Sequence, residues 1–329
     1  MEYRNLGKSG LRLSALSLGS WITFGEQIDQ EMATDCMKVA YEAGVNFFDN
    51  AEAYAHGKSE TIMGNILKKT GWKRSDLVIS TKLFWGGRGP NDRGLSCKHI
   101  FEGIHASLKR LQLDYVDLLF CHRPDRTTPI EETVWAMNLT IQQGKALYWG
   151  TSEWSAAEIM EAHGIAWREH LIPPLMEQPE YNMFHRGPVE RELAPLYKKV
   201  GLGTTIYSPL ANGLLTGKYN HGIPSGTRAT LKGYDWLREW LESEEIQGNM
   251  VKVSQLASIA QELSCSLAQM ALAWCLTNPN VSTVITGASR PDQVGENLGA
   301  LEIVEKLTPE VMGRIEAVLG NKPEAEEES

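Results

Sequence analysis

The stretch Val45-Asn46-Phe47-Phe48-Asp49-Asn50-Ala51-Glu52-Ala53-Tyr54 combines a short apolar run, a carboxylate and, five residues later, a tyrosine. Residues 45–48 are predicted to form a fully buried strand, because apolar residues follow one another in the run without alternation. Asp49 then lies where the strand ends, and Tyr54 lies in the loop beyond it. A carboxylate at the carboxyl end of a strand in an α/β protein is a candidate functional residue.

The same order of strand and helix recurs along the chain. Eight apolar runs are predicted strands: residues 16–18, 45–48, 77–81, 115–121, 146–151, 175–178, 203–208 and 282–286. Helical patterns cover residues 29–43, 59–69, 96–111, 130–143, 155–168, 189–199 and 291–300. This alternation indicates a parallel sheet. Eight units in about 250 residues favour a closed (β/α)8 TIM barrel over an open doubly wound sheet. An open sheet of that kind would also need a GxGxxG motif after its first strand, and residues 19–25 lack it.

Three segments lie outside this alternation. Residues 3–6 and 11–13 flank a glycine-rich turn and are predicted to form an N-terminal β-hairpin. Residues 209–249 form a long loop after the seventh strand, either functional or a mere surface insertion. Residues 308–319 are an extra C-terminal helix that covers one end of the barrel or an adjacent face. We expect one domain over residues 1–320 and an acidic flexible tail over residues 321–329.

The composition excludes several classes of protein. The chain has 329 residues and a net charge of −9, which argues against a broad surface for nucleic acid. Its five cysteines include no CxxC pair, which argues against a disulfide framework or a metal site and favours a reducing compartment. No stretch has the apolar length of a membrane span, and the first residues lack the apolar core of a signal peptide. We therefore expect a cytoplasmic protein without membrane insertion.

Polar side chains mark the predicted strand ends, which converge on one site in a barrel. They are Asp49, Lys82, His122, Ser152, Gln178 and Ser208, with Tyr54 just past the second strand. Each alone has an ordinary explanation, such as a cap, a solvated charge, a loop histidine or a packing residue. An acid, a lysine, a histidine and a tyrosine on neighbouring strand ends together indicate an active site.

This set has the chemistry of a proton donor to a carbonyl. A tyrosine ionises near pH ~10, and a neighbouring ammonium group is expected to lower its pKa. Asp49 would keep Lys82 charged, and His122 would orient the substrate oxygen as negative charge develops on it. No side chain supplies hydride, so a nicotinamide cofactor is implied. Residues 287–293 lead into a helix start that suits a phosphate, with Ser289 and Asp292 as a capping pair and Arg290 as a further contact, or simply form a capped helix.

The sequence resembles the aldo-keto reductases over essentially its whole length, and within them the branch of the voltage-gated potassium channel beta subunits. The resemblance rests on residues 21–25, 46–54, 79–82, 114–119, 177–182, 207–210, 213–219 and 287–289. It implies an NADPH-dependent barrel enzyme that reduces a small carbonyl substrate, with NADP+ as the oxidised cofactor. By the family pattern Tyr54 is the general acid, Lys82 and Asp49 tune it, and His122 orients the carbonyl.

The resemblance also implies a set of binding residues. Near the first strands and the nicotinamide, the cofactor contacts are Gly19, Ser20, Trp21, Gln27, Asp49, Ser152, Gln178 and Tyr207. Around the pyrophosphate they are Ser208, Pro209, Leu210, Ala211, Lys218 and Arg228, within a long loop that covers the cofactor. At the adenosine-phosphate end they are Gly287, Ser289, Arg290, Gln293, Glu296 and Asn297, which favours NADPH over NADH. Trp21, Phe84 and Trp85 are candidates for lining the substrate pocket, or simply pack in the barrel mouth.

Two departures from the family pattern separate the functional alternatives. Animal channel subunits carry asparagine where His122 stands, so the histidine favours a catalytically competent reductase. Glu153 replaces a residue that is often asparagine or arginine in relatives, which removes support for a direct cofactor contact there. The alternative function is a cytoplasmic auxiliary subunit of a potassium channel alpha subunit, forming a homotetramer and using bound NADPH as a redox sensor. We expect no pore block, because no extension precedes Tyr3.

Overall fold

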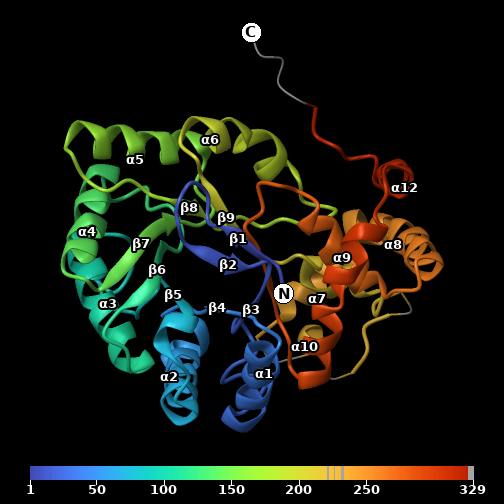
Figure 1. The fold of residues 1–329 in the computed structure, drawn as a ribbon, viewed down its shortest axis with the longest axis horizontal. Helices are drawn as coiled ribbons and strands as arrows, with labels where there is room; N and C mark the ends of the chain where they lie inside the picture. Colours follow the sequence, from blue (N-terminus) through green and yellow to red (C-terminus); the bar gives the residue numbers. More distant parts are fainter. Residues whose placement is uncertain (221, 226, 231–232, 325–329) are drawn as a thin grey trace. The chain divides into compact units, whose positions relative to one another are not determined.

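Eight parallel strands close into a barrel in the order β10-β3-β4-β5-β6-β7-β8-β9 (Figure 1). The strands are β3 Leu16–Gly19, β4 Phe47–Asp49, β5 Val78–Leu83, β6 Val116–Cys121, β7 Ala146–Thr151, β8 Met176–Glu177, β9 Gly203–Ile206 and β10 Thr283–Thr286. Apart from Leu147 and Tyr148 of β7, every residue of these strands is buried, as expected when helices cover the outer face of a parallel barrel. The (β/α)8 prediction is therefore confirmed.

The computed structural model describes residues 1–220, 222–225, 227–230 and 233–324. Its contacts group these residues into two units. The first unit contains Met1–Pro179, Glu192–Tyr207 and Asn280–Gly295, and therefore the whole barrel. The second contains Glu180–Arg191, Ser208–Pro279 and the described residues from Glu296 onward. The single domain over residues 1–320 stays a prediction, and residues 325–329 of the predicted tail lie outside the described residues.

Helices of the first unit lie around the barrel (Figure 1). They are α1 Gln30–Glu42, α2 Lys58–Thr70, α3 Cys97–Leu111, α4 Ile130–Gln142, α5 Ala156–Arg168 and α6 Ala194–Lys199, and α10 Pro291–Leu298 begins here. The predicted cap Asp29 accepts a hydrogen bond from the backbone of Met32. The predicted helix over residues 189–199 is split into a π-helical turn, Pro188–Glu192, and α6, because Pro195 has no N–H for a continuous helix.

An antiparallel hairpin, β1 Tyr3–Asn5 and β2 Arg12–Ser14, precedes the barrel and confirms the predicted one. Leu6 and Leu13 from this hairpin are fully buried in one cluster with Phe47, Val78 and Met176 from the barrel strands. Each of these three strand residues is the first residue of its strand. The hairpin therefore closes the end at which the strands begin and leaves the carboxyl ends for chemistry.

The second unit is mainly helical. It contains the short 3-10 helices η4 Ala211–Thr216, η5 Arg228–Thr230 and η6 Val304–Lys306, and the helices α7 Asp235–Glu242, α8 Glu244–Glu262, α9 Leu267–Leu276, α11 Ala300–Ile303 and α12 Pro309–Leu319. The predicted long loop over residues 209–249 therefore carries regular helices, including the start of α8. The predicted extra C-terminal helix is present as α12. Nζ of Lys252 in α8 donates to the carbonyl oxygen of Leu319, the last residue of α12, at 2.7 Å.

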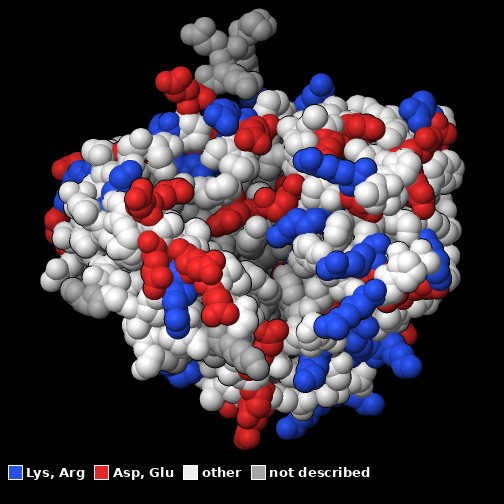
Figure 2. All heavy atoms as spheres, turned by 180° about the vertical axis from the view of Figure 1, so that it is seen from behind, with Lys and Arg blue, Asp and Glu red and all other residues white. Residues whose placement is uncertain are grey.

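The surface carries both signs of charge on the face drawn in Figure 2. Within the described residues, none of the helices combines the length and the apolar character that crossing a bilayer requires.

Candidate active site

Asp49 and Lys82 form a buried ion pair on the neighbouring strands β4 and β5. Asp49 is the last residue of β4, whereas Lys82 lies one residue inside β5 rather than after it. Nζ of Lys82 donates to Oδ2 of Asp49 at 2.5 Å and to the carbonyl of Asn50 at 2.8 Å. The lysine is 0% exposed and the aspartate 3%. A lysine this deeply buried needs such a partner, because an isolated buried charge is very costly.

Tyr54 is held against this ion pair by an unusual turn. It begins a 3-10 helix, η1 Tyr54–Gly57, in which Ala55, His56 and Gly57 have positive φ angles of 49°, 54° and 83°. Left-handed backbone at two successive non-glycine residues is strained, and such strain clusters at functional sites. Nζ of Lys82 donates a third hydrogen bond, to the hydroxyl of Tyr54 at 3.1 Å. The predicted trio of Asp49, Lys82 and Tyr54 is thus brought together.

His122 follows β6 and completes the cluster. Its ring lies 5.7 Å from the ring of Tyr54 and 4.9 Å from that of Trp85, in edge-to-face arrangements. The side chain is buried, and its Nδ1 has no hydrogen-bond partner among the described residues. Phe84 packs on Trp85 with 4.8 Å between ring centroids. Both of these aromatic residues remain partly exposed, as expected of residues that line a pocket.

Arg123 belongs to this cluster but was not identified from the sequence. Its guanidinium carbon lies 5.7 Å from the ring centroid of Trp85 and 6.0 Å from that of Tyr207. One terminal nitrogen, Nη1, donates to the carbonyl of His122 at 2.6 Å and to Oγ of Ser152 at 3.2 Å. The only sequence signal was its position directly after a candidate catalytic histidine.

The electrostatics of the cluster correct one prediction. Loss of hydration raises the pKa of Tyr54 well above its usual value, the charge of Asp49 raises it further, and Arg123 acts in the opposite direction. The prediction that a neighbouring ammonium group gives Tyr54 a lowered pKa is therefore wrong, because burial and the carboxylate outweigh the nearby cations. Tyr54 consequently carries its proton near neutral pH.

Lys82 and His122 also have shifted pKa values. Burial lowers the pKa of Lys82, while the charge and the hydrogen bond of Asp49 oppose that shift. Burial lowers the pKa of His122 well below its usual value, and the charges of Lys82 and Arg123 lower it further. His122 is therefore a neutral imidazole near pH 7, with one nitrogen that can donate a hydrogen bond.

Ser152 and Gln178 lie in a hydrogen-bond network beside the ion pair. Oγ of Ser152 donates to the carbonyl of Gln178 at 2.8 Å. The side-chain amide of Gln178 donates to Oδ1 of Asp49 at 3.2 Å. Ser20 extends this network, because its hydroxyl donates to the carbonyl of Asp49 at 2.9 Å. Trp21, directly after it, is 37% exposed, which leaves its ring accessible to a ligand.

The start of α10 differs in detail from the prediction. The backbone N–H and the hydroxyl of Ser289 both donate to Oε1 of Gln293, at 2.8 and 3.1 Å. Asp292 instead pairs with Arg290 at 3.2 Å, on the surface. The predicted pairing of Ser289 with Asp292 is therefore wrong, because the longer glutamine side chain reaches back to the turn. Pro291 is the first residue of the helix, as predicted.

The second unit contains a turn with several left-handed residues beside an ammonium group. Ser208, Ala211, Asn212 and Gly213 all have positive φ angles, of 53°, 47°, 54° and 92°. The last three of these residues are successive, so the turn lacks the alternation of right- and left-handed residues that forms a concave anion site. The N–H groups of Ala211 and Gly213 instead donate to the carbonyls of Ser208 and Leu210, both at 2.9 Å. A Cβ atom at Gly213 would lie 2.8 Å from Nζ of Lys218, so the glycine makes room for that ammonium group. The feature of this turn that suits a pyrophosphate is therefore the ammonium group of Lys218.

No contact among the described residues joins the remaining predicted cofactor residues into one site. Gln27 and Gly287 lie in the first unit, and Pro209, Leu210, Glu296 and Asn297 in the second. The side chain of Arg228 lies outside the described residues. Their roles stay predictions.

Comparison with known proteins decides the family. The profile described as the aldo/keto reductase family matches residues 15–319, which include every strand of the barrel and all four candidate catalytic residues. The chain belongs to the aldo/keto reductase family. This aldo/keto reductase is 56% identical over 328 residues to a protein of Oryza sativa subsp. japonica named "Probable voltage-gated potassium channel subunit beta". A protein of Arabidopsis thaliana with the same name is also 56% identical, and each alignment covers 99% of both chains.

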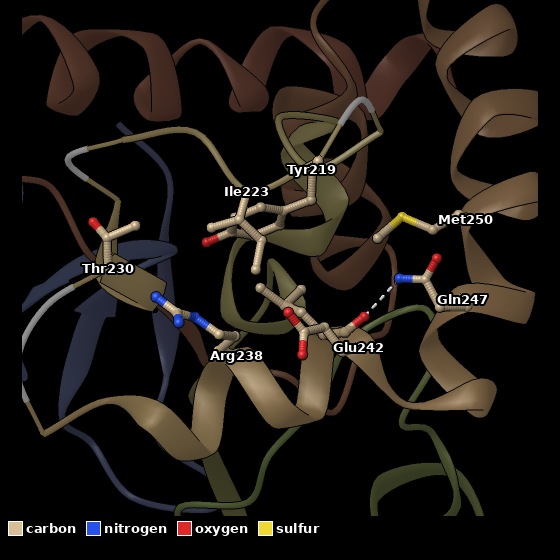
Figure 3. A pocket seen from close by; sticks show the side chains of 9 residues that line it. Tyr219, Ile223, Thr230, Arg238, Glu242, Gln247 and Met250 are labelled. Carbon is tan, nitrogen blue, oxygen red and sulfur yellow. Dashed lines mark hydrogen bonds between the residues drawn. The ribbon is translucent and has the colours of Figure 1, made fainter.

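A cavity of about 360 Å³ lies within the second unit of this aldo/keto reductase (Figure 3). Its lining residues are Tyr219, Gly222, Ile223, Thr230, Arg238, Leu241, Glu242, Gln247 and Met250. Gln247 donates across its wall to the carbonyl of Leu241 at 2.8 Å. None of the four candidate catalytic residues lines it, so we do not assign the chemistry of the family to this cavity.

Glu177, directly before Gln178, is expected to make the stability of this aldo/keto reductase depend on pH. Loss of hydration raises the pKa of the fully buried carboxyl from 4.5 to about 8, although Thr151 and the backbone of Trp154 donate hydrogen bonds to it. The nearby charge of Glu153 acts in the same direction as burial. Between these two pH values the folded state binds more protons than the unfolded state, so stability falls as the pH rises.

We expect the free energy of unfolding to fall by a few kcal/mol between pH 5 and pH 8, and Glu177→Gln to remove most of that slope. The amide keeps the shape of the neutral acid and has no proton to lose. Urea unfolding at several pH values measures the effect, with the exposed Glu161→Gln as a matched control. An unchanged slope in Glu177→Gln would assign the pH dependence to another group.

Proposed function

We propose that this aldo/keto reductase reduces aldehydes and ketones to alcohols with NADPH. The observation that carries the proposal is the position of Nζ of Lys82. This buried group donates to both the carboxylate of Asp49 and the hydroxyl of the partly exposed Tyr54, beside His122. A phenol hydrogen-bonded to an ammonium group is a proton donor aimed at developing negative charge. Family membership supports the same class of reaction.

The cofactor fits two features of the chain. In the first unit, Ser152, Gln178 and the accessible Trp21 would hold the nicotinamide end, with Tyr207 against the ring. In the second unit, the ammonium of Lys218, beside the turn from Ser208 to Gly213, would hold the pyrophosphate. When bound, NADPH supplies the hydride that no side chain can supply. Ser289, Arg290 and Gln293 would contact the adenosine phosphate, with Arg290 offering a charge-assisted contact.

The protein groups manage the proton and the substrate oxygen. Tyr54 donates its proton to the carbonyl oxygen as negative charge develops there. Lys82 stabilises the resulting phenolate, which compensates for the raised pKa of the partly buried phenol. Asp49 keeps Lys82 in place and charged. Neutral His122 donates a hydrogen bond to the same oxygen and orients the carbonyl.

The direct test follows NADPH consumption with a panel of aromatic and aliphatic aldehydes and ketones. We expect saturable oxidation of NADPH and formation of the matching alcohol. A wild-type protein that binds NADPH but reduces none of the panel would contradict the proposed activity.

Asp49→Asn is expected to weaken activity less than removal of the Tyr54 hydroxyl, and to leave NADPH affinity largely intact. The asparagine oxygen can still accept the hydrogen bond of Ser80, which contacts Oδ1 at 2.7 Å, but it no longer balances the charge of Lys82. Steady-state kinetics and a fluorescence titration with NADPH measure the two effects, with the exposed Asp114→Asn as control. Loss of NADPH binding in Asp49→Asn would mean that this residue acts through the cofactor.

The curated relatives favour a second function. Both are named as probable voltage-gated potassium channel beta subunits, and the identity extends over nearly the full length. We therefore propose, as the alternative, a cytoplasmic homotetrameric subunit of a potassium channel that uses NADPH as a redox sensor. Co-expression with a potassium channel alpha subunit of the source organism and affinity purification test this function. Recovery of the chain without the channel, under conditions that keep the channel assembled, would argue against it.

A further inference from the structure

Arg123 presents an uncompensated cation to the active-site cluster. Its side chain is partly buried, and no carboxylate lies within ion-pair distance of it among the described residues. A guanidinium that loses hydration without a counter-ion is costly, so such an arrangement calls for a compensating ligand. Other partly buried arginines among the described residues are paired, as Arg74 is with Asp117 at 2.6 Å and Arg110 with Glu60 at 2.6 Å.

The hydrogen bonds of Arg123 leave part of its donor fork available. Both of its hydrogen bonds to the protein come from one nitrogen, Nη1. Nε and Nη2 have no partner among the hydrogen bonds of the described residues. The guanidinium has five N–H donors in a planar fork that matches the two oxygens of a carboxylate. The Nη1 bonds therefore fix the group in place, and the other edge of the fork is free to bind an anion.

The surroundings of Arg123 connect it to the substrate rather than to the barrel core. It lies beside the rings of Trp85 and Tyr207, and Trp85 packs on His122. Its charge acts on Tyr54 and His122, the two groups that contact the carbonyl oxygen in the proposed reaction, and on Lys82, which donates to Tyr54. Because the ring of Trp85 contacts both Arg123 and His122, an anion on Arg123 would lie near the group that orients the carbonyl in the proposed reaction.

On this basis we propose that Arg123 binds a carboxylate group of the substrate, so that the preferred substrates are planar or aromatic aldehydes and ketones that carry a carboxylate. This inference rests on the proposed reductase function and specifies its substrate class. The aromatic rings of Phe84 and Trp85 provide the apolar wall for the planar part. Arg123 is thus a specificity-determining residue, whereas the proton transfer belongs to Tyr54.

The experiment compares acids with their neutral esters. The 2-, 3- and 4-carboxybenzaldehydes are assayed against the corresponding methyl formylbenzoates, which keep the ring and the aldehyde and lack the charge. For at least one isomer, we expect wild type to favour the acid in kcat/KM by about tenfold to a hundredfold, as for a charge-assisted hydrogen bond. The preference should arise mainly in KM and should weaken as salt is added.

Arg123→Gln should remove most of this preference, and Arg123→Lys, which keeps the charge but not the fork, should remove part of it. Arg126→Gln is the matched control, because it removes the same charge from an exposed position in the same loop. NADPH affinity is measured for each variant. The inference is overturned if the ratio of kcat/KM for acid and ester is the same in wild type and Arg123→Gln for all three isomers. A loss of NADPH binding with that ratio unchanged also overturns it, because Arg123 would then act on the cofactor. Failure of wild type to reduce even the esters would overturn the reductase function, and this inference with it.

Discussion

Tyr54→Phe is expected to lower kcat for aldehyde reduction by about 10²–10⁴-fold, the range over which a positioned general acid contributes. The substitution removes one oxygen, the atom to which Lys82 donates at 3.1 Å, and leaves the ring that packs against His122. Binding of NADPH and of substrate should change little, because the lost interaction is realised only as charge develops on the carbonyl oxygen. Single-turnover consumption of NADPH and a separate cofactor titration measure the two parts.

Tyr41→Phe is the matched control for this experiment. It removes a phenol oxygen from a tyrosine of α1 that lies outside the cluster and stacks on Trp72. The hydroxyl of Tyr41 donates to Asp76 at 3.4 Å. We expect wild-type activity from it. Retention of more than about a tenth of wild-type kcat in Tyr54→Phe would move the role of acid to another group, and neutral His122 would be the next candidate.

The pKa directions also predict how this activity depends on pH. Because the pKa of Tyr54 is raised and that of His122 is lowered, neither group changes its protonation state near neutral pH. The protonated phenol and the neutral imidazole therefore both persist from slightly acidic to slightly alkaline solution. The rate of the chemical step should be nearly flat there, and a single-turnover profile measures it. A bell-shaped profile centred on pH 7 would contradict these protonation states.

Most of the barrel could be predicted because its strands are buried on both faces and so appear as continuous apolar runs. All eight predicted runs overlap an observed strand. The clustering of Asp49, Lys82 and His122 followed from topology alone, since neighbouring parallel strands bring their carboxyl ends to one edge. The local turn at Tyr54 was less predictable, because its left-handed residues are alanine and histidine rather than glycine alone.

Arg123 shows what sequence reasoning could not reach. Its environment is formed by Trp85 and Tyr207, which are far from it and from each other along the chain, so no local pattern reports the contacts. The direction of the Tyr54 pKa was missed for a related reason. Burial depends on how completely the folded chain excludes water, and this cannot be inferred from the spacing of charged residues. The Ser289 partner was missed because aspartate and glutamine both suit a helix start.

Lys82→Met is expected to be the most destabilising single change in the cluster, lowering the free energy of unfolding by about 3–5 kcal/mol, as is typical when one partner of a buried ion pair is removed. Methionine fills a similar volume, but it leaves the carboxylate of Asp49, 3% exposed, without its cation. The remaining hydrogen bonds from Ser80 and Gln178 only partly compensate that charge. Urea unfolding measures the loss, and activity should fall with it.

The double variant Lys82→Met with Asp49→Asn separates stability from chemistry. It removes both charges, so the carboxylate no longer lies unpaired in the barrel, and most of the lost stability should return. Activity should not return, because the phenolate of Tyr54 still has no ammonium group beside it. A double variant as unstable as Lys82→Met would mean that the packing and hydrogen bonds of the lysine, rather than its charge, stabilise the barrel. Recovery of activity would mean that Tyr54 donates its proton without Lys82.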